Sequence, residues 1–499
     1  MLTRLKITGF KNLLDIDLSF GPFTCIAGGN AVGKSNLFDA IMLLSALADR
    51  PLIEAAMSVR DEGGRGTDIR TLFHLSPDGF VEKMRLEAEM IVPPSGYDDL
   101  GQAAQASITF LRYSVELAYK PGGLDNLRPG IHLTHETLEH INLGDAWRHL
   151  PFEHSLRWRK SVVTGRRTSP FISTVEAPEG NTVRLHQEGS GGRTRSVLAA
   201  SLPRTVLSTV NAAESPTAVL ARREMQSWRL LQLEPSALRA PDSFTAPTHV
   251  ASEGSHLPAT LYSLARQKQD ADDPVNDVNV YAKVSNRLSE LVEDVRQIGV
   301  DRDDARELLT LYVISKDGTQ HPARSLSDGT LRFLALAVLE SDPGARGVLC
   351  FEEPENGIHP ERIVAMIELL RDLAVDANVE VGENNPLRQV VINTHSPTVV
   401  AEVPDDSLLL GERVSYTRGG SRVNTVIFRP LAGTWRTKLE DAPQPIQRGR
   451  ILAFLNPVKA REGEGEGAEF MGRHSHRRVI ERDDLRQLSL WAHLSSAGK

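Results

Sequence analysis

The chain has 499 residues, of which 40% are hydrophobic and 24% are charged, and its formal net charge is −8. This composition is typical of a soluble globular protein with two or three domains. The negative net charge excludes a surface that is basic throughout. No apolar run approaches the roughly 18 residues of a membrane span. The lack of a C-x-x-C pair excludes a cysteine zinc site. We therefore expect a cytoplasmic protein without a membrane partner, in which Cys25 and Cys350 are reduced core residues.

The N-terminal part of the chain contains its most informative segment. Residues 28–35, GGNAVGKS, fit the phosphate-binding pattern G-x-x-x-x-G-K-[ST] at every fixed position. The apolar run 23–27 predicts a strand before this loop, and residues 37–44 predict a helix after it. Backbone N–H groups of such a loop surround phosphate oxygens, and the helix N-terminus adds partial positive charge. We expect Lys34 to reach the β- and γ-phosphates of a nucleotide and Ser35 to ligate Mg²⁺.

The middle of the chain is predicted to contain antiparallel strands followed by a polar region. Residues 51–80 read as a surface loop, whereas the alternating patterns at 84–92 and 107–119 predict strands of a meander that continues to about residue 163. The polar segment 155–229 holds 12 Lys/Arg against 5 Asp/Glu. It is the best candidate for a nucleic-acid surface, with a solvated loop as an equal alternative. Its few aromatic residues give weak support for base stacking: Trp158, Phe171 and Trp228.

A regular pattern of helices and strands resumes in the C-terminal half. We expect helices at 255–267, 275–298, 331–339 and 360–373, and strands at 347–351, 388–393 and 407–410. The chain then contains a low-complexity linker at 461–467 and a basic stretch at 473–478.

The strand at 347–351 is predicted to end in acidic residues of a nucleotide site. Carboxylates at the carboxyl edge of a parallel sheet face a bound nucleotide. We expect Glu352 to hold Mg²⁺ through water and Glu353 to polarise the attacking water. The alternative is a strand followed by a solvated acidic turn.

Two further motifs flank this strand. Residues 325–332, SLSDGTLR, open a helix, where Ser and Gly can present a hydroxyl and N–H groups to phosphate, although a simple helix cap by Ser327 is the more economical interpretation. His395 follows the strand at 388–393 and is a candidate sensor of the γ-phosphate. The alternative is an ordinary histidine at the end of a strand.

The order of these motifs resembles the RecF/SMC/OLD-related ABC-class ATPases, often described as predicted AAA-type ATPases. The resemblance is carried by four segments: 7–13 (ITGFKNL), 27–36 (AGGNAVGKSN), 253–258 (EGSHLP) and 352–360 (EEPENGIHP). It implies an α/β P-loop NTPase of the ABC/SMC-head type, with an antiparallel β-subdomain and a mixed α/β or helical insertion. The family often has Asp where this chain has Glu352. The glutamine of the family's glutamine loop is not located, and Gln102, Gln105 and Gln187 are unsupported candidates.

On this basis the chain divides into four parts. We expect an N-terminal lobe at 1–150, a basic and partly irregular insertion at 151–255, a C-terminal lobe at 256–430, and a linker and tail at 431–499 that docks a partner.

The resemblance also implies a head-to-tail dimer, or a higher homo-oligomer, of ATPase heads. ATP would lie between the loop of one subunit (Gly28, Asn30, Gly33, Lys34, Ser35 and Asn36) and the serine–glycine motif of the other (Ser327, Asp328, Gly329 and Thr330). Ser35 and Glu352 would hold Mg²⁺, while Glu353 and His395 would act in catalysis. We expect an ATPase that uses ATP and Mg²⁺ and gates DNA processing or an antiphage effector, with a separate effector protein and DNA as partners.

Other functions are less well supported. A nucleotide-dependent scaffold with little turnover fits the same motifs. The 292 positions between Ser35 and Ser327 argue against a membrane-transporter ATPase subunit. An OLD-type nuclease is disfavoured because the 104 residues after His395 offer only Asp405-Asp406 and Asp483-Asp484 as acidic pairs.

Overall fold

The computed structural model describes residues 1–59, 68–122, 130–178, 180–188, 194–267, 276–418, 421–439 and 441–455. The linker at 461–467, the basic stretch at 473–478 and the Asp483-Asp484 pair lie outside these residues.

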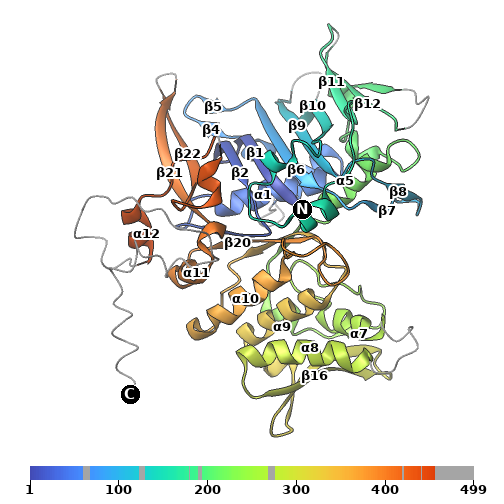
Figure 1. The fold of residues 1–499 in the computed structure, drawn as a ribbon, viewed down its shortest axis with the longest axis vertical. Coiled ribbons are helices and arrows are strands. Elements are labelled where there is room, and N and C mark those ends of the chain that lie inside the picture. Colours follow the sequence, from blue (N-terminus) through green and yellow to red (C-terminus); the bar gives the residue numbers. More distant parts are fainter. Residues whose placement is uncertain are drawn as a thin grey trace.

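A six-stranded sheet crosses the middle of the molecule and carries the predicted site (Figure 1). Its strands, in spatial order, are β14 (Arg229–Leu231), β19 (Gly347–Glu352), β20 (Arg388–Thr394), β3 (Phe23–Ala27), β21 (Leu408–Arg418) and β22 (Ser421–Pro430). The first five strands pair in parallel, and β22 returns antiparallel to β21. The carboxyl ends of β3, β19 and β20 therefore meet at one edge of the sheet, where ligands bind in open α/β sheets.

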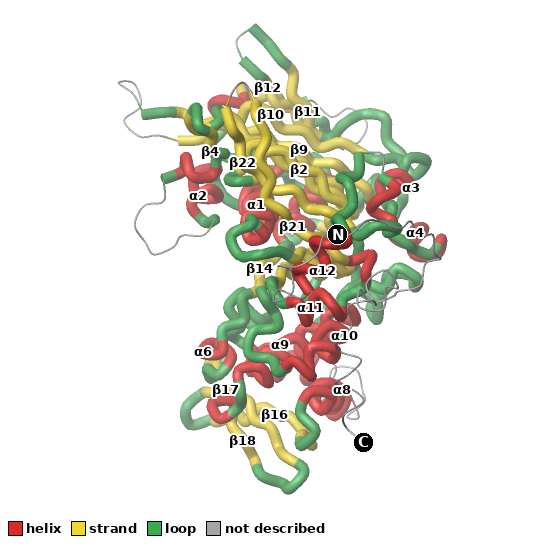
Figure 2. Tube along the Cα trace, turned by 90° about the vertical axis from the view of Figure 1, so that its left-hand side faces the viewer, coloured by secondary structure: helices red, strands yellow, loops and turns green. Residues whose placement is uncertain are grey.

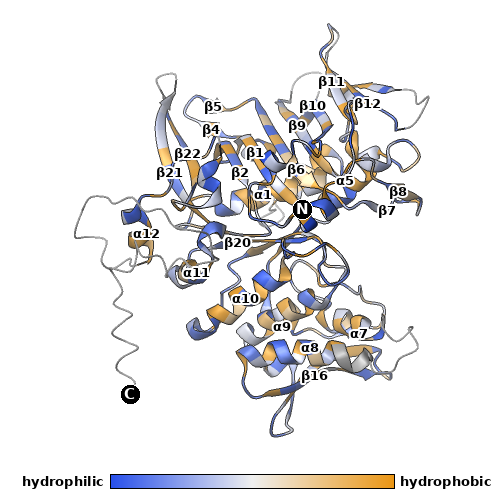
Figure 3. Cartoon of the chain, in the orientation of Figure 1, coloured by the Kyte–Doolittle hydropathy of each residue, from blue (hydrophilic) through white to orange (hydrophobic). Residues whose placement is uncertain are grey.

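The three central strands β3, β19 and β20 are buried on both faces, which explains their unbroken apolar runs. Val348 and Cys350 pack on one side with α1 (Lys34–Leu47) and α5 (Pro216–Gln226), whereas Leu349 and Phe351 pack on the other side with α9 (Asp328–Ser341) and α10 (Ile363–Leu373). Apolar residues gather along α9 and α10 (Figure 3). Cys25 and Cys350 are buried and free, as predicted.

An eight-stranded antiparallel sheet covers the α1 side. Its strands, in spatial order, are β13 (Arg195–Leu198), β12 (Thr182–Leu185), β11 (Ile172–Val175), β10 (Gly130–His140), β9 (Phe110–Lys120), β6 (Lys83–Ile91), β1 (Leu2–Phe10) and β2 (Leu13–Ser19). The strands predicted at 84–92 and 107–119 are confirmed as β6 and β9. The structure thus confirms the predicted α/β class with an antiparallel β-subdomain.

The continuation of this meander to residue 163 was wrong. After β10 the chain forms α3 (Ala146–His149) and α4 (Leu156–Val162). Ser155 caps α4, because its Oγ accepts a hydrogen bond from Trp158 N at 3.0 Å, and Trp158 is fully buried. The region predicted to be irregular also contains order, since β11–β13 extend the sheet and Pro216 begins α5.

Smaller elements complete this part of the molecule. They are α2 (Leu52–Met57), β4 (Leu75–Ser76), β5 (Gly79–Phe80), β7 (Ser95–Tyr97), β8 (Ala103–Gln105), α11 (Pro397–Glu402), α12 (Arg448–Leu455) and the 3₁₀ turns η1 (Ile69–Leu72), η2 (Ala199–Ser201), η3 (Leu207–Thr209), η6 (Asp405–Ser407) and η7 (Trp435–Lys438). The predicted surface loop at 51–80 therefore includes a short helix and a short hairpin.

A mixed lobe lies below the central sheet and contains α9 and α10 (Figure 2). Its other elements are α6 (Pro235–Leu238), β15 (Asp242–Ser243), α7 (Leu257–Gln267), α8 (Asn276–Leu291), β16 (Val295–Asp303), β17 (Leu308–Ser315), β18 (Gln320–Pro322), η4 (Ala323–Ser325) and η5 (Pro360–Arg362). The helix predicted at 275–298 ends at Leu291, because the residues from Val295 pair with β17.

The predicted domain boundaries at 150, 255 and 430 stay a prediction. Within the part of the chain that the structure describes, no helix combines the length and apolar character that a membrane crossing requires.

Candidate nucleotide site

The glycine loop joins the end of β3 to the start of α1. Gly33 has a φ of 112°, in the left-handed region, and a Cβ there would lie 2.4 Å from Asn12 Nδ2. Asn12 holds the loop, because its Nδ2 donates to Val32 O at 3.0 Å and its Oδ1 accepts from Asn36 Nδ2 at 2.8 Å. A Cβ on Gly28, at the other end of the loop, would come within 3.0 Å of Gly411 O. Glycine is thus required at both positions.

Lys34 is folded back onto the loop. Its Nζ donates to Gly28 O at 2.8 Å and to Gly29 O at 3.0 Å, and the residue is 7% exposed. Burial lowers the pKa of Lys34, while the nearby carboxylates of Glu353, Glu355 and Glu352 act in the opposite direction. The lysine therefore lies among opposite charges at the open side of the loop.

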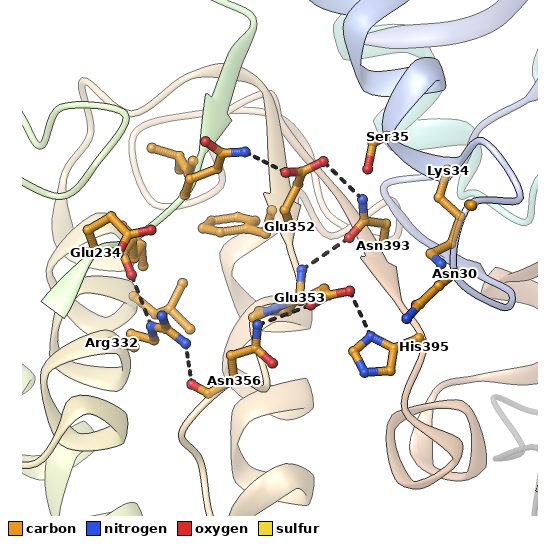
Figure 4. A pocket seen from close by; sticks show the side chains of 17 residues that line it. Asn30, Lys34, Ser35, Glu234, Arg332, Glu352, Glu353, Asn356, Asn393 and His395 are labelled. Carbon is orange, nitrogen blue, oxygen red and sulfur yellow. Dashed lines mark hydrogen bonds and ion pairs between the residues drawn. The ribbon is translucent and has the colours of Figure 1, made fainter. Parts of the chain in front are cut away.

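A cavity of about 510 Å³ adjoins the loop (Figure 4). Six of the predicted site residues line it: Asn30, Lys34, Ser35, Glu352, Glu353 and His395. They come from β3–α1, β19 and β20, so the parallel sheet brings distant segments of the sequence together. Other lining residues were not predicted from the sequence: Gln232, Glu234, Arg332, Asn356 and Asn393.

Glu352 and Glu353 differ in their surroundings. Glu352 accepts a hydrogen bond from Gln232 Nε2 and a longer one, at 3.4 Å, from Asn393 Nδ2. Glu353 has a φ of 46°, which is uncommon for a residue with a side chain. Its backbone N donates to Asn393 O and Asn393 Oδ1, both at 3.1 Å. The sharp turn that begins at Glu353 turns its side chain away from Glu352.

Both carboxylate oxygens of Glu353 have partners. Asn356 Nδ2 donates to Oε2 at 3.1 Å, and His395 Nδ1 lies 2.7 Å from Oε1. The side chains of Glu353 and His395 remain 33% and 45% exposed. The pair is therefore held in one orientation and is accessible from the cavity.

Gln232 is one of the lining residues that sequence reasoning missed. It follows β14, a three-residue strand whose short apolar run gives little signal, and it contacts Glu352 beside the cavity. Gln102 and Gln105 lie at the β7–β8 hairpin and Gln187 follows β12, and none of these three lines the cavity. Ser35 and Glu352 contribute a hydroxyl and a carboxylate to the lining of the cavity, and oxygen groups of these kinds suit Mg²⁺. Gln232 directs its amide nitrogen at Glu352 in this arrangement.

The serine–glycine motif lies outside this cavity. Ser327 caps α9, since its Oγ accepts from Thr330 N at 3.2 Å, as the simpler interpretation predicts. A Cβ on Gly329 would lie 2.4 Å from Gly357 O, so the motif packs against the segment after β19. Asp328 is exposed and accepts from Arg239 Nη2 at 2.5 Å. None of the four motif residues lines the cavity beside the glycine loop.

The structure also shows where the basic segment 155–229 and the Asp405-Asp406 pair lie. The segment 155–229 is divided among α4, β11–β13, α5 and β14, and its aromatic residues Trp158, Phe171 and Trp228 are all buried, which removes the suggested base stacking. Asp405 and Asp406 lie in η6, before β21.

Comparisons with known proteins agree with the predicted family. Residues 199–401 match the family described as "AAA domain, putative AbiEii toxin, Type IV TA system". The match includes the segments of Gln232, Ser327, Glu352, Glu353 and His395, and it agrees with the AAA-type resemblance predicted from the sequence. No curated protein sequence matches the chain.

Solved structures of SMC head domains are also similar to the chain. An Smc head bound to the C-winged helix domain of ScpA is 12% identical, with a TM-score of 0.43, and the alignment covers 86% of this chain and 98% of that chain. An Smc head with an extended coiled coil, bound to the C-terminal domain of ScpA derived from Pyrococcus furiosus, is 11% identical, with a TM-score of 0.40 and coverage of 86% and 96%. The SMC head domain from Thermotoga maritima is 10% identical, with a TM-score of 0.33 and coverage of 86% and 98%.

Proposed function

We propose that this protein is an ATPase whose ATP-bound dimer controls a DNA-processing or antiphage effector supplied by a separate protein. The observation that carries the ATPase activity is the meeting of Lys34 and Ser35 with Glu352, Glu353 and His395 around one cavity. The AAA-type family match over residues 199–401 supports the same activity.

Each residue has a distinct task in this proposal. Lys34 leaves the carbonyls of its loop and binds the β- and γ-phosphates, and the N–H groups at the start of α1 add to the positive field. Ser35, Glu352 and Gln232 would hold Mg²⁺, which neutralises phosphate charge. Glu353 orients the attacking water and accepts its proton. Phosphoryl transfer depends mainly on positioning and charge, so a carboxylate fixed by Asn356 and His395 suits this task.

Dimerisation would give a role to the serine–glycine motif, in which Ser327 and Asp328 are exposed. Ser327 to Thr330 would close over the nucleotide of a second subunit, with the start of α9 directed at the γ-phosphate. Hydrolysis would then remove the group that joins the subunits, and the dimer interface would act as the switch.

Two substitutions test the ATPase assignment. We expect Lys34→Ala to lose ATP binding, and Glu353→Gln to bind ATP but hydrolyse it about 100-fold or more slowly. Nucleotide binding is measured by fluorescence of a labelled ATP analogue and hydrolysis by phosphate release. Lys283→Ala and Glu361→Gln remove exposed charges of the same kind elsewhere and serve as controls.

The outcome also separates the ATPase from a scaffold. A wild-type rate in Glu353→Gln would overturn the catalytic assignment. Tight ATP binding with no turnover in the wild-type protein, with and without DNA, would favour the nucleotide-dependent scaffold instead.

A further inference from the structure

A second cleft, of about 640 Å³, lies where α1 and α5 end and β14 begins. The described side chains that line it include four arginines and two aspartates: Arg50, Arg222, Arg223, Arg229, Asp49 and Asp99. The arginines outnumber the carboxylates by two in a protein whose overall charge is negative. The cleft is therefore a local positive site on an acidic molecule.

One carboxylate serves two of these arginines. Asp99 lies 2.6 Å from Arg222 Nη2 and 2.8 Å from Arg223 Nη2. Arg222 is 8% exposed, and its Nε donates to Ala48 O at 3.1 Å, so its guanidinium is fixed in place. Arg223 also donates from Nε to Tyr97 O at 3.0 Å and from Nη1 to Gln226 Oε1 at 3.2 Å. The shared carboxylate compensates only half of the positive charge of the two arginines, and the remaining charge on fixed guanidinium groups suits a phosphate.

Of the remaining polar groups of the cleft, some favour a bound anion and others oppose it. Arg229 donates to Val250 O at 3.2 Å, and burial lowers the pKa of its guanidinium. Asp49 accepts from Gln226 Nε2 at 3.1 Å. The C-terminal carbonyls of α1 and α5 repel anions, so the arginines must supply the attraction. Ser45, Ser58 and Ser252 also line the cleft. The hydroxyl of Ser45 donates to Trp228 O at 3.2 Å and that of Ser58 to Ala55 O at 2.9 Å, so they would have to exchange these partners to bind a phosphate.

The cleft is connected to the nucleotide cavity through one residue. Gln232 lines both, and β14 links it directly to Arg229. On the cavity side, Gln232 Nε2 contacts Glu352. A ligand that moves Gln232 from the cleft side would therefore alter the group proposed to hold Mg²⁺.

We infer that this cleft binds a phosphate group and that its occupancy changes the affinity of the protein for ATP through Gln232. The phosphate belongs either to a nucleic-acid strand or to a small ion or nucleotide. The coupling rests on the proposed nucleotide site, whereas the binding itself does not.

Binding is measured on the full chain without ATP, with two probes. One is a fluorescent single-stranded oligonucleotide followed by anisotropy, and the other is inorganic phosphate followed by calorimetry. We expect Arg50→Gln combined with Arg223→Gln to weaken binding at least tenfold. The control combines Arg306→Gln with Arg371→Gln, which removes two exposed arginines elsewhere. This control should bind both probes as the wild type does. Thermal unfolding checks that both variants are folded.

Each result decides the proposal. Oligonucleotide binding that the cleft variant loses identifies a nucleic-acid phosphate, and loss of inorganic phosphate binding alone identifies a small ligand. The absence of binding of both probes, or equal binding in the cleft variant, overturns the proposal. Because the glycine loop also attracts phosphate, all measurements are repeated in Lys34→Ala, where the difference between cleft variant and control must persist.

Coupling is tested separately, since linkage requires that ATP and the cleft ligand change each other's affinity by the same factor. We expect the affinity of the bound probe to change at least threefold when a non-hydrolysable ATP analogue is added, and Gln232→Leu to abolish that change. An unchanged affinity overturns the coupling and leaves the binding site standing. Failure of the proposed ATPase would appear differently, as probe binding without any turnover of ATP.

Discussion

Glu355 and Thr394 connect the two segments that carry the proposed catalytic residues. Glu355 is 8% exposed, burial raises the pKa of its carboxyl group, and its side chain accepts a hydrogen bond from Thr394 Oγ1. The same hydroxyl oxygen accepts from Ser396 N at 2.9 Å. One threonine hydroxyl thus sets the spacing between the turn of Glu353 and the turn of His395.

Loss of this hydroxyl should misplace the catalytic pair without affecting nucleotide binding. We expect Thr394→Val to lower kcat for ATP about 10- to 100-fold with little change in KM, because small displacements at a reacting centre are costly. Thr394→Ser should restore most of the rate, and Thr398→Val is the matched control. Steady-state phosphate release checks this, and a wild-type kcat in Thr394→Val would refute the positioning role.

Gln232 makes a second residue-scale prediction. If its amide oxygen helps to hold Mg²⁺, Gln232→Leu should raise the Mg²⁺ concentration for half-maximal ATPase activity about tenfold, as losses around metal sites commonly do. Gln102→Leu changes the same residue type at a candidate from the sequence that lies away from the cavity, and it should behave as the wild type. Equal Mg²⁺ titrations of the two variants would remove Gln232 from the site.

At the scale of elements, a buried carboxylate joins the antiparallel sheet to η3. Glu136, on β10, accepts hydrogen bonds from Val206 N at 2.7 Å, Leu207 N at 2.9 Å and Tyr113 OH at 3.1 Å. Complete burial nevertheless raises the pKa of Glu136 from 4.5 to about 7, and these donors only partly oppose the shift. Folding therefore favours the protonated form of this side chain.

The contact should make stability depend on pH with a defined sign. Because the folded protein holds the proton more tightly than the unfolded chain, the contribution of Glu136 is complete below about pH 4.5 and is lost as pH rises through about 7. We expect the free energy of unfolding of the wild type, relative to Glu136→Gln, to be larger at pH 5 than at pH 8 by about 2 to 3 kcal/mol. Urea unfolding of both proteins at the two pH values measures this. If the wild type and Glu136→Gln differ by the same free energy of unfolding at pH 5 and pH 8, the raised pKa of Glu136 is contradicted.

The elements also show which features a sequence can predict. The strands β3, β19 and β20 were predicted because parallel strands buried on both faces are continuous apolar runs. The boundary between α8 and β16 was missed, because both contribute apolar residues to one core and only pairing with β17 distinguishes them. β14 was missed because a strand of three residues shows no periodicity. Gln232, the residue after this strand, was therefore not predicted as part of the site.

At the scale of the whole molecule, the motif residues divide into two sets. The glycine loop, Glu352, Glu353 and His395 meet around one cavity, whereas Ser327 to Thr330 are not among the residues that line it. Arg332, in the next turn of α9, does line it. The sequence could predict both sets but not their separation, which depends on the position of the lower lobe. In the proposed dimer, the second set would complete the cavity of a neighbouring copy.

A mixing experiment tests this arrangement. Lys34→Ala disables the glycine loop, and Ser327→Arg places a bulky charge where the motif would meet the partner, so each variant alone should neither associate on addition of ATP nor hydrolyse it. In a mixed dimer, the intact loop of the Ser327→Arg subunit faces the intact motif of the Lys34→Ala subunit. An equal mixture in which subunits pair at random should therefore regain about a quarter of the wild-type sites. Light scattering measures association and phosphate release measures activity. A mixture of Arg306→Gln with Lys34→Ala is the control, because it shows how far an inactive subunit dilutes an active one. If the mixture of Lys34→Ala and Ser327→Arg restores neither association nor hydrolysis, the motif does not act across a dimer.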